Sequence, residues 1–104
     1  MSELKLVLKK QWYGMVESGE KKEEYRDITA YWCKRFANIL GRRDPETGVF
    51  YPLFGSVTFY LGYAKNRPSM TYEMVSIRIG EGRQEWGAIP GKKYFIIELG
   101  QRVK

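Results

Sequence analysis

Histidine is absent from this chain of 104 residues, and cysteine occurs once, as Cys33. Without histidine the chain lacks the commonest general base, the commonest zinc ligand and every Ser-His or Cys-His catalytic pair. A single cysteine excludes a disulfide within the chain, which is typical of cytoplasmic proteins. We therefore expect no metal, no other cofactor and a cytoplasmic location. Any catalysis must rest on Lys, Glu, Asp, Tyr, Ser or Thr.

Long apolar runs are also missing, since none approaches the roughly 20 residues that cross a bilayer. Lys5, Lys9 and Lys10 interrupt the first segment, so it lacks the apolar centre of a signal peptide. The hydrophobic content of 43% and aromatic content of 15% are typical of a folded globular protein. The length suits one domain over residues 1–104, and we expect no membrane association.

Acidic residues are too few to balance the basic ones, which leaves a net charge of +6. Residues 1–27 are balanced, and the excess of Lys and Arg lies in residues 28–104. An excess of this size favours polyanionic partners such as RNA. Many small basic proteins bind nothing anionic, however. A protein-interaction module whose basic face meets an acidic partner is therefore a further interpretation of the charge.

The apolar patterns predict an α+β fold, a small β-barrel of about five strands with two short helices. The expected strands cover residues 3–8, 22–26, 55–63, 70–79 and 93–99. The expected helices cover residues 9–18 and 29–40, and residues 41–48 have the composition of an exposed loop. Cys33 falls in the second helix, where we expect it to pack as a small apolar residue.

Residues 19–26 are the most informative segment, because mixed charges stand where the first helix gives way to a strand. Gly19 can take the left-handed conformation that ends a helix. In a regular strand Glu24 and Arg26 share one face, and Lys21 joins them only if the preceding turn swings it round. Two interpretations follow: the three residues form a ligand site, or they form ion pairs that only close the barrel.

The spacing Gly19-x-Lys21-x-x-Glu24-x-Arg26 resembles the G-x-K-x-x-E-x-R signature of the ASCH domain family. That family belongs to the PUA-like β-barrels, which are linked to RNA. The resemblance extends to a leading strand and helix at residues 4–8 and 11–16, and to a closing segment at residues 89–100. It implies a PUA-like barrel that binds RNA or a nucleotide-derived ligand in a cleft around the motif.

In such a cleft, Lys21 would meet an anionic or carbonyl oxygen and Glu24 would accept from a base amino or sugar hydroxyl group. Arg26 would orient Glu24 or bind a phosphate. The alternative is a metal-independent hydrolase, acting on a modified nucleoside or on RNA with Lys21 and Glu24 as acid and base. Some small relatives resemble acetylcytidine amidohydrolases, in which a threonine occupies the position of Glu24 and a later glutamate completes the site. Glu85 and Glu81 are the candidates for that glutamate.

Aromatic residues interleaved with Lys and Arg can stack on unpaired bases. Four of them are expected in the core instead: Trp12, Phe36, Phe59 and Phe95. Three lie in polar surroundings and are candidates for a cleft wall: Tyr31, Trp32 and Trp86. The loop at residues 80–87 adds Arg83 as a candidate ligand contact, although the loop is equally interpretable as a plain connector.

Overall fold

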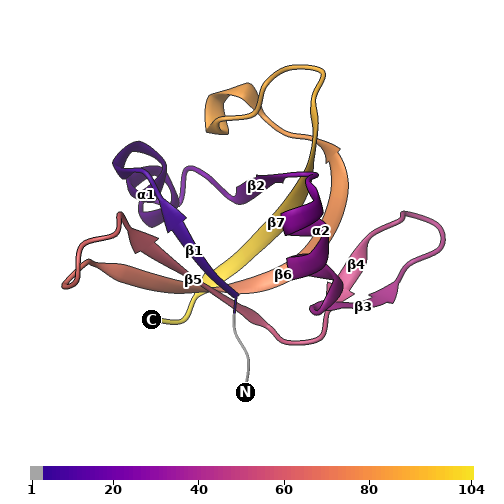
Figure 1. The fold of residues 1–104 in the computed structure, drawn as a ribbon, viewed down its shortest axis with the longest axis horizontal. Coiled ribbons are helices and arrows are strands. Elements are labelled where there is room, and N and C mark those ends of the chain that lie inside the picture. Colours follow the sequence, from indigo (N-terminus) through magenta and orange to yellow (C-terminus); the bar gives the residue numbers. More distant parts are fainter. Residues whose placement is uncertain (1–3) are drawn as a thin grey trace.

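A computed structural model describes residues 4–104, and it contains seven strands, two α-helices and one short 3-10 helix (Figure 1). The strands are β1 (Leu4–Leu8), β2 (Glu23–Asp27), β3 (Leu40–Arg43), β4 (Phe50–Pro52), β5 (Ser56–Leu61), β6 (Ser69–Glu81) and β7 (Lys93–Arg102). The helices are α1 (Lys10–Glu17), α2 (Ala30–Ala37) and the 3-10 helix η1 (Gln84–Trp86).

One mixed sheet contains all the strands. Its main path runs β1-β5-β6-β7-β2, in which β1 and β5 are parallel and the other pairs are antiparallel. The 13-residue strand β6 is the spine, because β5 and the short β3–β4 pair add to it as well as β7. Irregularities in its register with β7 bend β6, and the sheet curls into an open half-barrel (Figure 1).

The two ends of this path, β1 and β2, meet across a seam. No backbone ladder joins them within the described part of the chain. The guanidinium of Arg26 spans the seam instead, because its Nη2 donates to the Val7 carbonyl at 3.1 Å. The half-barrel is therefore completed by side chains from the motif, where a closed barrel would have another set of backbone hydrogen bonds.

The core lies inside the curled sheet. It is built from the inward residues of β1, which alternate with outward ones, and from the apolar positions of β5, β6 and β7. Helix α1 contributes Tyr13 and Val16, and α2 contributes Phe36, which lies against Phe95. The Tyr72 hydroxyl donates to the Val16 carbonyl at 3.0 Å, so α1 is fixed to β6.

The expected α+β fold, with a curled sheet and two short helices, is confirmed. All five expected strands are present with shifted ends, although Glu3 of the first one lies outside the described residues. Residues 41–48 are not all loop, because 40–43 form β3 with 50–52 as its partner. The packing role expected for Cys33 is wrong, since its side chain is exposed. No helix in residues 4–104 is long and apolar enough to span a membrane.

Candidate functional site

The end of α1 places the motif lysine. Gly19 has a φ of 86°, the left-handed conformation expected of it, and its N–H donates to the Val16 carbonyl at 3.0 Å. The chain then turns back, so that the Lys21 N–H donates to the Met15 carbonyl at 2.9 Å. This turn directs the Lys21 side chain inward, to the face of β2 that carries Glu24.

Lys21, Glu24 and Arg26 form a nearly buried ionic triad. Lys21 Nζ lies 3.1 Å from Glu24 Oε1, and Arg26 Nη2 lies 2.7 Å from Glu24 Oε2. Lys21 and Glu24 are only 2% and 6% exposed. One carboxylate therefore holds two cations, and the triad keeps a local excess of positive charge.

The surroundings of Lys21 act on its charge in opposite directions. Burial lowers the pKa of Lys21 from its ordinary value of 10.5, while the Glu24 carboxylate opposes this shift. The ammonium also donates to the Glu23 carbonyl and lies 4.6 Å from the centre of the Tyr25 ring. Its hydrogen bonds and its ring contact are therefore made inside the protein.

Arg26 extends the triad across the seam between β1 and β2. Besides Glu24 and the Val7 carbonyl, its guanidinium contacts the Trp32 ring, with Cζ 5.2 Å from the ring centre. Its Nε is buried and has no hydrogen-bond partner in the described part of the chain. Arg26 thus links β1 to β2 and lies at the seam between these two strands.

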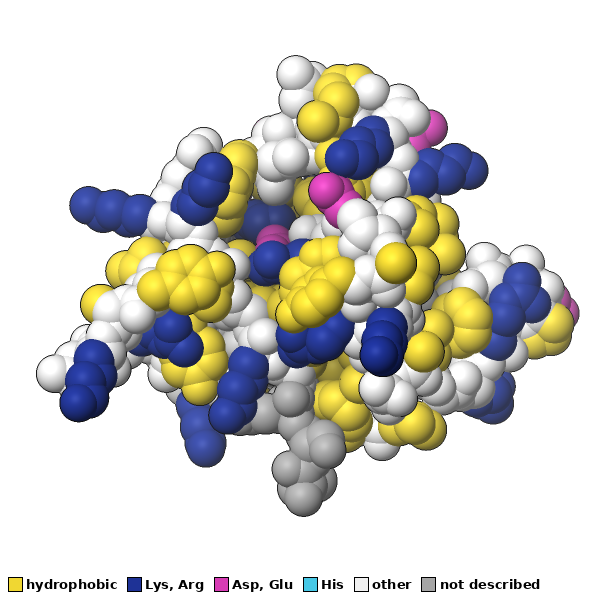
Figure 2. Space-filling model, in the orientation of Figure 1, with side chains coloured by type: hydrophobic (Ala, Val, Ile, Leu, Met, Phe, Trp, Pro, Cys, Tyr) yellow, Lys and Arg dark blue, Asp and Glu magenta, His cyan; other side chains and the backbone are white. Residues whose placement is uncertain are grey.

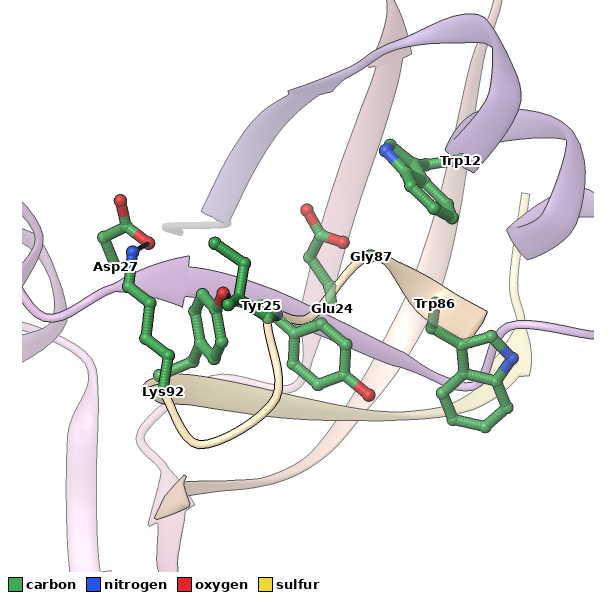
Figure 3. A pocket seen from close by; sticks show the side chains of 9 residues that line it. Trp12, Glu24, Tyr25, Asp27, Trp86, Gly87 and Lys92 are labelled. Atoms are coloured by element: carbon green, nitrogen blue, oxygen red, sulfur yellow. Dashed lines mark hydrogen bonds and ion pairs between the residues drawn. The ribbon is translucent and has the colours of Figure 1, made fainter. Parts of the chain in front are cut away.

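A cavity of about 310 Å³ opens beside the triad. Its lining residues come from α1, β2, η1 and the segment leading into β7: Trp12, Glu24, Tyr25, Asp27, Trp86, Gly87, Ile89, Lys92 and Tyr94. Figure 3 shows the Glu24 carboxylate directed toward the side where Trp12 lies. The ion pair between Lys92 and Asp27, at 3.1 Å, lies at the opposite end of the pocket from the two indoles.

The loop after β6 shapes this cavity. The Arg83 N–H donates to the Tyr25 hydroxyl at 2.9 Å, which fixes the loop to β2. Gly87 has a φ of 103°, and a Cβ there would lie 3.0 Å from the Trp12 ring. A glycine is therefore needed for η1 to approach α1 closely enough to bring Trp86 and Trp12 to one cavity.

The structure places Glu24 and Arg26 together, as expected of one strand face, and the turn at Gly19 swings Lys21 round to join them. Of the triad, Glu24 and not Lys21 lines the 310 Å³ cavity. Trp86 also lines it, as expected of a cleft wall. The other predicted site residues lie elsewhere: Tyr31 and Trp32 line a separate groove beyond Arg26, and Arg83, Glu85 and Glu81 are exposed.

Glu85 is not brought to the triad. Its side chain is 60% exposed and pairs with Arg83 at 3.6 Å. It is not among the residues that line the cavity.

Sequence reasoning missed several cavity residues. Trp12 was expected in the core with Phe36, Phe59 and Phe95; those three are buried, whereas Trp12 is only half-buried and lines the cavity. Its helical spacing from Leu8 gave the wrong signal, because the buried face of α1 is centred on Tyr13 and Val16. Lys92 and Tyr94 gave no signal beyond a turn followed by a strand.

Within residues 4–104, no three His, Cys, Asp or Glu side chains lie close enough together to hold a metal ion. Comparison of the chain with protein-family models, with curated proteins and with solved structures gave no match. The resemblance of the motif to ASCH domains therefore stays a prediction.

Proposed function

We propose that the cavity beside the triad binds a base of RNA or of a modified nucleoside. One observation carries this proposal: two indoles, Trp12 and Trp86, line the same cavity as the carboxylate of Glu24. Its volume of about 310 Å³ is at the low end of the range for small-molecule sites. Indoles offer stacking faces to a base, and the carboxylate offers acceptors to its edge.

Glu24 favours bases with an amino group. An ionised carboxylate can only accept hydrogen bonds, and Lys21 and Arg26 occupy one lone pair on each of its oxygens. The remaining lone pairs suit the amino group of cytosine, adenine or guanine. Uracil places two carbonyl oxygens beside its single ring N–H, and these oxygens would be repelled by the carboxylate.

The motif resemblance supports the same class of ligand, because it implies an RNA-linked ASCH domain with a PUA-like barrel. The charge of +6 also favours an anionic partner. A cytoplasmic location, in contact with cellular RNA, belongs to this proposal.

A titration with nucleosides tests the proposal. We expect cytidine to quench tryptophan fluorescence saturably and uridine to bind more weakly. Replacing Trp86 by Leu should weaken cytidine binding about tenfold, since base–aromatic stacking is worth about 1–3 kcal/mol. The matched control is Tyr51→Leu, an exposed aromatic on β4 outside the cavity, which should bind as the native chain does. Equal affinities in the two variants would contradict the proposal.

Hydrolysis of a modified nucleoside is the second candidate. The observation that favours it is a buried lysine with a lowered pKa next to a carboxylate that faces a cavity. Glu24 would be the group in contact with substrate, and Lys21 would be its acid–base partner. Acetate release from N4-acetylcytidine would be measured on the native chain, Glu24→Gln and Glu85→Gln. We expect turnover to be lost only in Glu24→Gln, and a native chain without turnover would exclude this activity.

A further inference from the structure

A second hollow lies on the other side of Arg26. It is a groove of about 360 Å³ between β1, α2 and the turn after β5. Three cations and three aromatic residues define it: Lys5, Arg26, Arg35, Tyr31, Trp32 and Tyr63. We call it the basic-aromatic groove. On the face drawn in Figure 2, basic and hydrophobic side chains alternate around β1 and α2, next to the hollow between α1 and α2.

A third pocket lies between the basic-aromatic groove and the cavity. It has a volume of about 210 Å³ and runs along the seam. It shares Trp12, Glu24 and Tyr25 with the cavity, and Val7 and Arg26 with the groove. A chain-like ligand could therefore enter the cavity at one end and lie in the groove at the other.

Two of the three cations in the groove, Lys5 and Arg35, are available to a ligand, whereas Arg26 is paired with Glu24. No acidic residue lines the groove, and no ion pair within residues 4–104 includes Lys5 or Arg35. Arg35 donates to the Tyr31 hydroxyl at 2.8 Å and its Cζ lies 5.4 Å from the centre of the Trp32 ring. Its guanidinium is thereby held in place over aromatic rings without being neutralised.

Its aromatic residues are also available. Tyr31 is 59% exposed and Tyr63 is 84% exposed, and both line the groove. Exposed rings beside unpaired cations are the combination that binds single-stranded nucleic acid, because cations contact phosphates and rings stack on bases.

We infer that the basic-aromatic groove binds the nucleotides adjoining the base in the cavity, so that the ligand is a single-stranded oligonucleotide and not a free nucleoside. This inference rests on the proposed function of the cavity. Lys5 and Arg35 contact the phosphates, and Tyr31 or Tyr63 stacks on a neighbouring base. Because the cations contact the phosphate backbone of the RNA, the groove adds affinity with little sequence specificity.

The test compares cytidine monophosphate with a short single-stranded RNA rich in cytidine, measured by calorimetric titration at two salt concentrations. Arg35→Gln removes a groove cation, and its matched control is Lys34→Gln, the exposed neighbour on α2 that does not line the groove. We expect the RNA to bind the native chain at least tenfold more tightly than the mononucleotide. Arg35→Gln should weaken RNA binding several-fold and reduce the salt dependence, and Lys34→Gln should do neither.

The outcomes separate the two proposals. If the mononucleotide binds as tightly as the RNA, the groove inference is overturned while the base site stands. If neither ligand binds at low salt, both are overturned. If Arg35→Gln and Lys34→Gln weaken RNA binding equally, only the overall charge of the chain matters for binding. That result would overturn the groove inference. Tighter binding of an acidic peptide than of RNA, with the same dependence on Arg35, would replace the inference by a protein partner.

Discussion

Glu24 is the residue on which the candidate site depends, because its carboxylate holds the buried ammonium of Lys21 and the guanidinium of Arg26. Removing it leaves two cations without their anion in a poorly solvated place. We expect Glu24→Ala to lower the free energy of unfolding by about 3 kcal/mol, measured by urea denaturation. Glu85→Ala breaks an exposed ion pair and should change it by less than about 1 kcal/mol. Similar losses in both variants would show that the triad does not brace the seam.

The lowered pKa of Lys21 predicts that the free energy of unfolding depends on pH. Burial lowers its pKa from 10.5, so in the alkaline range below that value the unfolded chain holds more protons at this residue than the folded chain. Stability contributed by Lys21 therefore rises with pH in this window. The native chain should gain stability relative to Lys21→Met as the pH rises toward 10.5, the ordinary pKa of lysine. Tyr25, whose pKa is raised by burial in the native chain, is present in both chains. A constant difference would contradict the desolvation of Lys21.

At the scale of elements, the turn from α1 into β2 positions Lys21 beside Glu24. Gly19→Ala would place an alanine at a φ of 86° with no contact to its Cβ, so only backbone strain acts. We expect a loss of about 1 kcal/mol in the free energy of unfolding. Gly14→Ala, in the exposed middle of the same helix with open space at its Cβ, should instead stabilise by about 0.8 kcal/mol. Thermal denaturation of both variants measures this, and changes of the same sign would contradict the assigned turn.

Features set by neighbouring residues could be predicted from the sequence, whereas contacts between distant segments could not. Gly19 predicted the end of α1, because the rule that favours glycine at a helix end is local. Four of the expected strands followed from apolar patterns for the same reason, and the charged strand β2 followed from its place after the end of α1. The sequence left open whether the turn after Gly19 would swing Lys21 toward Glu24. Trp12 was assigned to the wrong environment, since helical spacing cannot tell which neighbours cover a face. Trp86 reaches the cavity through the approach of Gly87 to α1, a contact between segments far apart in the chain.

At the scale of the whole molecule, the net charge of +6 should appear in the salt dependence of binding. Each phosphate contacted on a single strand contributes about −0.7 to the slope of log affinity against log salt concentration. With Lys5 and Arg35 of the basic-aromatic groove each engaged with a phosphate, we expect a slope of about −1.4 for the RNA. An uncharged nucleoside should give a slope near zero, because it contacts only the cavity. Calorimetric titrations over a range of salt concentrations measure both, and equal slopes would contradict a division into cavity and groove.

The central claim is that the cavity lined by Trp12, Glu24 and Trp86 binds a nucleobase, and the three tryptophans of the chain allow one direct measurement. Each indole N–H gives its own NMR signal, and these signals would be followed during a titration with cytidine. We expect the signals of Trp12 and Trp86 to shift and saturate together, while that of Trp32, in the groove beyond Arg26, stays in place. No shift at all, or a shift of Trp32 alone, would contradict the central claim.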